Sequence, residues 1–336
     1  MNTRGLFITQ SKRGSDVSLD RIVIAGASGF VGTYLARALR AEGAAVRTIG
    51  RNNADATWGD TRAIADLLDG ADVLINLAGK SVNCRYGRAN REEIMRSRVD
   101  TTQELAAAVA RCSAPPALWI NSSTATIYRD ARDRPMTEST GELGSGFSVG
   151  VARAWESAFF EVETPVTRKV ALRMAIVLGD GSALVPLVRL ARFGLGGPQV
   201  DGRWWATRTR RAAGTFHERS AKAGLQKFSW VHIADVLGVV RFVRDHPEID
   251  GVVNVSAPNP SDNATLMRTI RRVIRAPFGM PAPRFLLEIG SALIRTETEL
   301  VLKSRWVVPE RLLAAGFEFE HPELEPALRD ILIPTE

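Results

Sequence analysis

The sequence predicts an α/β protein with a doubly wound parallel sheet and a smaller, mixed C-terminal lobe. Apolar strands alternate with amphipathic helices through the first half, a glycine-rich turn follows the first strand, and the alternation ends after Gly179. Strands separated by helices pair in parallel through right-handed crossovers. We therefore expect a flexible tail over residues 1–20, a sheet domain over 21–180 and a second lobe over 181–336.

The expected elements follow one another in order. Strands of the sheet domain are expected at 22–25, 45–49, 73–77, 117–121 and 169–178. Helices are expected at 34–42, 61–68, 92–110 and 153–161. The near-continuous apolar run at 73–77 is typical of a parallel strand covered on both faces. In the lobe, the patterns indicate strands at 230–233 and 252–255, and helices at 265–274, 285–294 and 310–315.

Composition restricts the class of protein. A chain of 336 residues is long for one core, and no apolar run approaches the roughly 18 residues of a membrane-spanning helix. The polar N-terminal segment is a poor secretory signal, and Cys84 and Cys112 are too few for a disulfide framework. We expect a cytoplasmic protein. Its net charge of +7 favours anionic partners.

The turn after the first strand predicts a nucleotide site. Gly26, Gly29 and Gly32 lie between a strand and a helical pattern. The first allows the turn, the second allows a ligand to approach the backbone, and the third allows the helix to pack on the sheet. The N–H groups at the start of such a helix bind a pyrophosphate. The expected contacts are Gly26, Ser28, Gly29, Phe30, Val31 and Gly32.

The second strand indicates which dinucleotide binds. Proteins that bind NAD usually carry an acid at its end, which takes the ribose 2′-hydroxyl. Here the end carries Arg51 and no acid, and a guanidinium can hold a 2′-phosphate. We predict NADP(H), with a solvated loop arginine as the alternative for Arg51. Asp60 is placed to accept from the adenine amino group. The third strand ends in residues expected near the ribose and pyrophosphate: Leu77, Ala78 and Gly79.

Motifs further along resemble those of the extended short-chain dehydrogenase/reductases. The segment WINSSTATIY, at 119–128, is similar to the family's hydroxyl-rich motif. Further segments resemble the "epimerase family protein" sub-group, which joins an NAD-dependent epimerase/dehydratase-like domain to a C-terminal domain of unknown function. These segments lie in order at 75–79, 96–102, 172–179, 194–197, 229–235, 254–260 and 308–317. The resemblance implies a Rossmann-like fold and an oxidoreductase that transfers hydride.

The resemblance also assigns roles near the reacting atoms. Its hydroxyl motif implies that Thr124 touches the reacting carbonyl, and a core hydroxyl bonded to the backbone is the alternative. The nicotinamide end is expected near Ser122, Ser123 and Arg173, and it would face Asn254.

The catalytic Tyr-x-x-x-Lys pair of the wider superfamily is missing. Counting back from Trp155 places Ser148 at the tyrosine position and Ala152 at the lysine position. The candidates that remain for proton chemistry are Tyr128, Arg153 and His232, and His232 is also a candidate substrate contact. A buried structural histidine is the alternative for His232. The four histidines are scattered away from cysteine or acid clusters, so we expect no metal site.

The basic stretch 203–227 is longer than the sub-group resemblance leads us to expect. It contains seven lysines and arginines among Trp204, Trp205 and Phe216. A solvated mobile insertion, a lid over an anionic substrate, and a surface for nucleic acid or membrane all remain open.

The combined interpretation is an NADP(H)-dependent oxidoreductase or epimerase-like enzyme. Its substrate would be a small carbonyl or sugar-nucleotide-like molecule, and an anionic one suits the positive charge. A nucleotide-sensing regulator without turnover, for example of cell division, is the alternative. The sequence does not indicate an oligomeric state.

Overall fold

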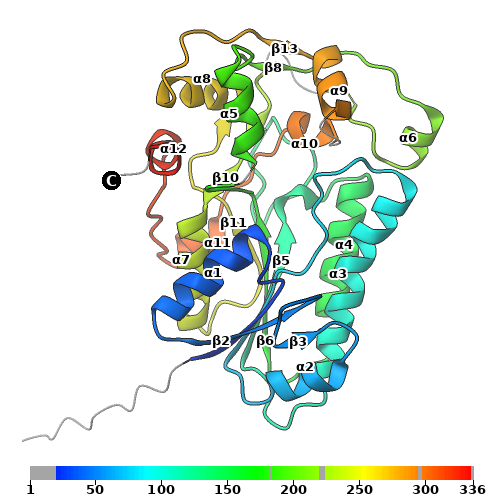
Figure 1. The fold of residues 1–336 in the computed structure, drawn as a ribbon, viewed down its shortest axis with the longest axis vertical. Helices are drawn as coiled ribbons and strands as arrows, with labels where there is room; N and C mark the ends of the chain where they lie inside the picture. Colours follow the sequence, from blue (N-terminus) through cyan, green and yellow to red (C-terminus); the bar gives the residue numbers. More distant parts are fainter. Residues whose placement is uncertain (1–19, 182, 219–223, 294–296, 334–336) are drawn as a thin grey trace, which may run out of the picture.

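A seven-stranded parallel sheet forms the centre of the computed structural model, which describes residues 20–181, 183–218, 224–293 and 297–333 (Figure 1). The strand order is β11-β6-β5-β4-β1-β2-β3, and every neighbouring pair is parallel. The strands are β1 (Arg21–Ala25), β2 (Ala45–Gly50), β3 (Ala56–Thr57), β4 (Val73–Asn76), β5 (Leu118–Thr124), β6 (Arg168–Met174) and β11 (Gly251–Val255). The predicted α/β class with its parallel sheet is confirmed.

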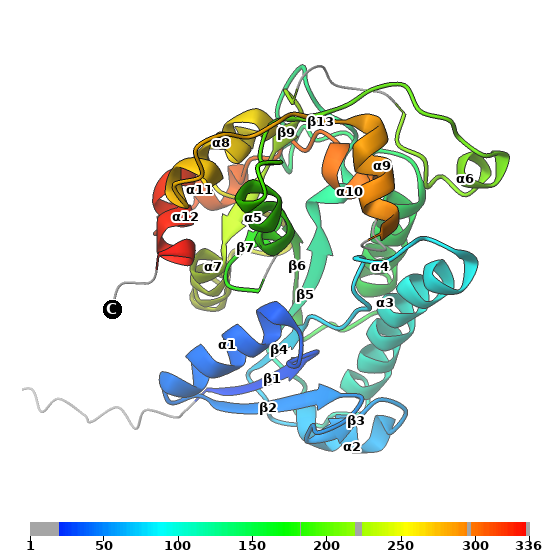
Figure 2. The same cartoon turned by 45° about the horizontal axis from the view of Figure 1, so that its top comes forward.

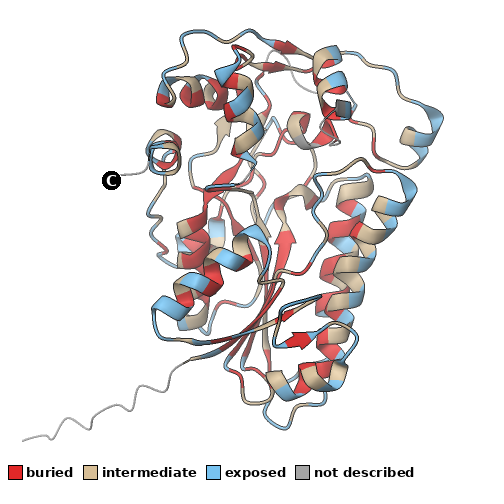
Figure 3. Cartoon of the chain, in the orientation of Figure 1, coloured by how far each residue is buried: buried red, intermediate tan, exposed pale blue. Residues whose placement is uncertain are grey.

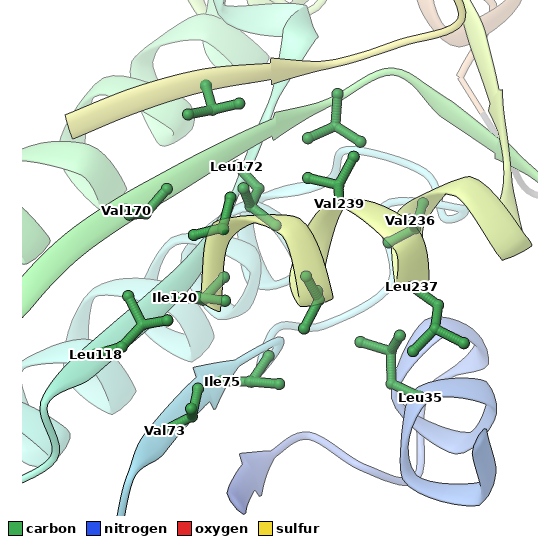
Figure 4. Close-up of a cluster of buried hydrophobic side chains, with 14 of the residues drawn as sticks. Leu35, Val73, Ile75, Leu118, Ile120, Val170, Leu172, Val236, Leu237 and Val239 are labelled. Carbon is green, nitrogen blue, oxygen red and sulfur yellow. The ribbon is translucent and has the colours of Figure 1, made fainter. Parts of the chain in front are cut away.

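Helices cover both faces of this sheet (Figure 2). One face carries α1 (Phe30–Ala41) and α7 (Ile233–Asp245), and the other carries α2 (Thr61–Leu68), α3 (Arg88–Val109) and α4 (Phe147–Phe160). Leu35 and Val239 pack against Ile75 and Ile120 on the first face (Figure 4). Strands buried on both faces are apolar on both, which explains the continuous apolar runs.

Two sequence predictions differ from the structure near the end of the sheet. The expected strand at 169–178 is interrupted at Ala175, so that β6 stays in the central sheet and β7 (Ile176–Leu178) pairs with β10 (Trp230–His232). The strand β11 belongs to the central sheet, so residue 180 does not separate the sheet from the lobe. The helix α7 was not predicted, although its apolar residues recur at helical spacing.

Most of the remaining elements form a smaller lobe beyond the carboxyl ends of the strands (Figure 1), whereas α11 (Glu310–Ala314) packs against the central sheet through Leu312. The helices α5 (Leu184–Arg192), α8 (Asn263–Val273) and α12 (Leu324–Leu332) share an apolar core with Trp230. Figure 3 colours the buried residues of these helices red. Short strand pairs join β8 (Gln199–Val200) to β13 (Ala282–Pro283), and β9 (Lys227–Phe228) to β12 (Ser261–Asp262). The other short elements are η1 (Ala125–Ile127), α6 (Arg208–Ala212), α9 (Arg284–Leu293) and α10 (Glu299–Leu302).

The middle of the basic insertion, residues 210–217, is packed against the protein. Arg210 contacts Glu288 at 3.4 Å and Glu297 at 3.2 Å, and His217 Nε2 lies 3.1 Å from a carboxylate oxygen of Asp201. The Gly214 carbonyl accepts a hydrogen bond of 2.9 Å from the backbone N–H of Phe147, where α4 begins. A mobile, solvated segment is therefore wrong for residues 210–217.

Two further expectations concern the ends of the chain and the membrane. The predicted tail lies outside the described residues, except for its last position. Within the described parts of the chain, no helix combines the length and the apolar character that a bilayer crossing requires.

Candidate functional site

The glycine turn has the geometry that the sequence predicts. Gly26 has φ +81°, and a Cβ there would come within 2.9 Å of the Ala78 backbone nitrogen. A Cβ on Gly32 would lie 2.4 Å from the Gly26 carbonyl oxygen. The turn and the close packing of α1 therefore both require glycine, and these two predicted roles are confirmed.

Gly29 differs because the protein's own packing does not require it. A Cβ there would meet only the Gly26 oxygen, at an ordinary 3.4 Å. Gly29 is the N-cap of α1 and supplies no side-chain cap, and the neighbouring Ser28 and Phe30 are exposed. Because N–H groups of a first helical turn, such as those of Phe30 and Val31, lack partners within the helix, this uncapped end fits an anionic phosphate group.

The segment after β4 lies against this turn through Leu77 and Ala78. The predicted contacts of Leu77, Ala78 and Gly79 with the cofactor stay a prediction. The buried Asn76 orders this segment, because its Oδ1 accepts from the Ala78 N–H at 3.0 Å. The Asn76 amide in turn donates to Asn121 Oδ1 at 2.7 Å. The glycine turn and the segment after β4 are about fifty residues apart in the sequence, and they thus come together at one edge of the sheet.

A cavity of about 450 Å³ opens beside the turn, between α1 and the loop after β2. Arg37 and Arg40 of α1 line it, and sequence reasoning missed both. Their spacing of three residues on α1, facing the end of β2, is the signal that could have identified them. Arg51 is exposed and does not line this cavity, although its neighbours Gly50 and Asn52 do.

Two acids near this cavity serve the protein's own structure. Asp55 accepts from the Thr48 N–H at 2.8 Å and pairs with Arg47 at 2.7 Å. Burial opposes ionisation of Asp55, but these hydrogen bonds prevail and lower its pKa. Asp60 is the N-cap of α2, and its Oδ1 accepts from the Ala63 N–H at 2.9 Å. Its contact with adenine stays a prediction.

A buried polar chain crosses the predicted reaction centre. Ser123 Oγ donates to Glu156 Oε1 at 2.6 Å, and Arg173 donates twice to the same carboxylate, at 2.8 and 2.6 Å. The third Arg173 nitrogen donates to the Tyr128 hydroxyl at 2.9 Å. That hydroxyl donates onward to Asn254 Oδ1 at 2.9 Å.

The buried polar chain changes four predictions, those for Tyr128, Asn254, Ser123 and Arg173. Tyr128 is 2% exposed and Asn254 is 0% exposed, so neither faces an open cavity. Burial raises the Tyr128 pKa although Arg173 opposes it, which argues against Tyr128 as the proton source. The polar groups of Ser123 and Arg173 are occupied by Glu156. Through these hydrogen bonds, the buried polar chain holds β5, α4, β6 and β11 together.

Other predicted residues near the reaction centre have different surroundings. Ser122 is buried, and Thr124 is half-buried with its Oγ1 accepting from the Thr126 N–H at 3.1 Å. The Thr124 hydroxyl hydrogen remains for a substrate oxygen, so its role stays a prediction. Arg153 lines a cavity of about 380 Å³ with Ile127, Leu143 and Glu156, whose carboxylate belongs to the buried polar chain. This cavity shares no lining residue with the one beside the glycine turn, and the catalytic role of Arg153 stays a prediction.

His232 lies in a cluster that the sequence did not indicate. Its Nε2 is 3.3 Å from Asp330 Oδ2, and its ring lies 3.8 Å from that of His321. The His232 Nδ1 accepts from the Ala234 N–H, which places the ring proton on Nε2, toward Asp330. This proton occupies the nitrogen that would bind a cation, and it places Nε2 as a donor 3.3 Å from the Asp330 carboxylate of α12. This contact argues against a substrate role.

Buried cations from the C-terminal lobe reach the end of β5, and sequence reasoning missed them. Lys303 Nζ donates to the Thr126 carbonyl at 2.8 Å, and Arg305 Nε donates to Thr126 Oγ1 at 3.2 Å. Burial lowers the Lys303 pKa to about 8, and the nearby Arg305 adds to this. Only the fold brings these residues to Thr126, since they lie more than 170 positions away.

Family models match two parts of the chain. Residues 22–147 match the NAD dependent epimerase/dehydratase family, and residues 282–331 match a domain of unknown function, DUF1731. The latter range contains Lys303 and Arg305.

Individual relatives match almost the whole chain. The mouse epimerase family protein SDR39U1 is 28% identical over 93% of this chain and 99% of its own length. The Arabidopsis thaliana homologue, described as chloroplastic, is 25% identical over 98% of this chain and 90% of its own, so a cytoplasmic location stays a prediction. A crystal structure of human SDR39U1 isoform 2 with NADPH has a TM-score of 0.78 and 28% identity, covering 93% of this chain and 98% of that one.

Proposed function

The chain belongs to the epimerase family proteins, which join an NAD-dependent epimerase/dehydratase domain to DUF1731, and from this premise we propose that it binds NADPH and reduces a small carbonyl compound. The uncapped N-terminus of α1 beside the glycine turn carries the proposal. The human relative crystallised with NADPH supports it.

Residues at two ends of the site would hold the cofactor. The first turn of α1 and the Leu77–Gly79 segment would bind the pyrophosphate, and Arg37 with Arg51 would bind the 2′-phosphate. Asp55 is committed to Thr48 and Arg47, so it does not serve as the acid that NAD requires. When bound, the dihydronicotinamide supplies a hydride, and the Thr124 hydroxyl would hold the substrate oxygen.

Two measurements test this proposal. Quenching of tryptophan fluorescence should give a lower Kd for NADPH than for NADH, and equal affinities would remove the case for the 2′-phosphate site. A panel of carbonyl compounds, anionic ones included, should then reveal NADPH oxidation that Thr124→Val diminishes. Binding without a contribution from Thr124 to turnover would contradict the assigned role of that hydroxyl.

A sensor without turnover is the second candidate. Its support is that Ser148 and Ala152 replace the phenol–lysine pair, while Tyr128 is locked in the buried chain. Tight NADPH binding with no carbonyl reduced across the panel would favour this alternative.

A further inference from the structure

Large apolar side chains are exposed at the tip of the C-terminal lobe. Phe193, which follows α5, is 83% exposed. Phe278 and Met280, in the loop between α8 and β13, are 62% and 55% exposed. The two loops lie at the end of the molecule opposite α2 (Figure 1). Single exposed apolar residues are ordinary on a protein surface, whereas several that gather in one patch indicate an interaction surface.

Contacts between the two loops make these side chains neighbours. A Cβ on Gly194 would lie 2.7 Å from the ring of Phe278, and Gly194 directly follows Phe193. The Met280 N–H donates to the Gly194 carbonyl at 2.8 Å, and the Gly197 N–H donates to the Met280 carbonyl at 3.0 Å. The three exposed side chains therefore belong to one patch, on loops that hydrogen bonds hold together.

The patch is bordered by positive charge that the protein does not neutralise. Residues 184–200 and 263–287 contain seven arginines and no acidic residue. Arg192 lies in the last turn of α5 and Arg275 follows α8, and both are exposed. Among the residues that the structure describes, no carboxylate lies within 4.0 Å of either guanidinium. We call the following residues the tip patch: Arg192, Phe193, Arg275, Phe278 and Met280.

An anionic lipid surface fits this combination of groups. Aromatic and other apolar side chains enter the boundary between headgroups and acyl chains, and arginines beside them are attracted to anionic headgroups. A stable protein interface takes about 800 Å² from each partner, with matching shape. Three apolar side chains on two short loops offer a small apolar area, and a bilayer requires no matching shape. The exposed rings and the free charges of the tip patch therefore favour a lipid surface over a protein partner.

We propose that the tip patch docks this protein on the surface of a membrane that contains anionic lipids. The side chains of Phe193, Phe278 and Met280 enter the interface, and those of Arg192 and Arg275 contact lipid phosphates. This inference goes beyond the proposed reduction with NADPH and does not depend on it. Neither family model covers the tip patch, because one match ends at residue 147 and the other begins at residue 282.

Cosedimentation with vesicles is the first test. The full chain should pellet with sucrose-loaded vesicles of phosphatidylcholine and phosphatidylglycerol, and should stay in solution with vesicles of phosphatidylcholine alone. Because salt screens the arginines and leaves the apolar contacts in place, added NaCl should weaken binding without abolishing it. No binding to the anionic vesicles would overturn the proposal.

Two double variants separate the apolar contribution from the charged one. Phe193→Ser with Phe278→Ser should lower the partition coefficient on anionic vesicles about tenfold or more, since two rings no longer enter the interface. Arg192→Glu with Arg275→Glu should lower it by at least about fivefold for each positive charge removed. Both variants should fold, because all four side chains are exposed, and NADPH should quench their tryptophan fluorescence as in the unchanged protein.

The opposite end of the molecule provides matched controls. Val166, in the loop before β6, is 70% exposed, and Arg111, just beyond α3, is exposed as well. Val166→Ser and Arg111→Glu remove the same kinds of group at the amino ends of the central strands, and they should leave vesicle binding nearly unchanged. An equal loss in these controls would mean that only the net charge of +7 attracts the protein to vesicles, and the proposal would fail.

A tryptophan at residue 193 distinguishes insertion from adsorption. The fluorescence of Phe193→Trp should be quenched by lipids that carry bromine on their acyl chains, more strongly than that of the unchanged protein or of Val166→Trp. Vesicle binding without this extra quenching would contradict insertion of the tip patch. If sedimentation velocity without vesicles shows a dimer that Phe193→Ser dissociates, the tip patch binds a second copy of the chain and the proposal is overturned.

Discussion

The nucleotide end and the predicted reaction centre use their polar residues in opposite ways. At the nucleotide end, Ser28 and Arg37 are exposed beside an open cavity and an uncapped helix. At the reaction centre, Arg173 and Glu156 have side chains that are 11% exposed and saturate one another. The first region is arranged for a ligand from solvent, whereas the second is consumed by the protein's own structure.

This difference shows where the C-terminal domain acts. The buried chain ends at Asn254, whose amide donates to the Val308 carbonyl at 3.1 Å, within DUF1731. Glu297 of the same domain accepts a hydrogen bond of 2.7 Å from the backbone N–H of Tyr86, in the loop before α3. We infer that the proposed cofactor site stands apart from the second domain, whereas the residues of the predicted reaction centre are held by it.

Breaking the buried chain should have the largest effect on stability. Glu156→Gln keeps the side-chain volume but leaves the Arg173 charge without its carboxylate. We expect the free energy of unfolding to fall by about 3–5 kcal/mol, as for other buried pairs that lose one partner. Urea unfolding followed by circular dichroism measures this. A loss below that of an exposed control pair, Arg88→Ala, would contradict the contrast between the two regions.

A substitution in the glycine turn should lower the stability of the protein nearly as much, but only at Gly32 and not at Gly29. Gly32→Ala would push a methyl group to 2.4 Å from the Gly26 oxygen, and we expect about 3 kcal/mol of destabilisation from this overpacking. Gly29→Ala meets no such contact and should leave stability unchanged while weakening NADPH binding. Parallel urea titrations and fluorescence titrations test the pair. Equal destabilisation by both changes would mean that packing, and not a ligand, explains Gly29.

The His232 contact should make stability depend on pH. Burial, with help from His321, lowers the His232 pKa to about 4. The unfolded chain, with a histidine pKa of about 6.5, therefore binds a proton first as the pH falls, and the folded state loses stability. Between pH 7 and pH 5 the loss should be about 2 kcal/mol.

A variant without a titrating ring provides the control for this pH dependence. His232→Asn keeps an acceptor for the Ala234 N–H but cannot be protonated. The difference in urea midpoint between pH 7 and pH 5 should therefore shrink in this variant. An unchanged difference would assign the acid sensitivity to other groups.

Local motifs were predictable and long-range contacts were not. The turn at Gly26 and Gly32 could be predicted because backbone sterics require glycine within one βαβ unit. The locked state of Tyr128 could not, since it depends on Asn254, 126 positions away. The interruption at Ala175 was equally hidden, because the apolar pattern runs on from β6 into β7. The helices and strands can thus be predicted from the periodicity of the sequence, whereas the hydrogen bonds of a hydroxyl such as that of Tyr128 depend on the whole fold.

The two arginines at the nucleotide end give the smallest effects and the sharpest test of sequence against structure. Sequence reasoning selects Arg51, whereas the structure places Arg37 on the wall of the cavity. A charge-assisted hydrogen bond to a phosphate is worth about 1.5–3 kcal/mol, so Arg37→Ala should weaken NADPH binding about tenfold or more and leave NADH binding unchanged. Arg51→Ala should have the smaller effect, because its exposed side chain pays more entropy to reach the same group.

Fluorescence titration of both variants with both cofactors decides between them, with Arg111→Ala, just beyond α3, as the control for net charge. A larger loss of NADPH affinity in Arg51→Ala than in Arg37→Ala would mean that the 2′-phosphate binds at the end of β2, as the sequence predicts.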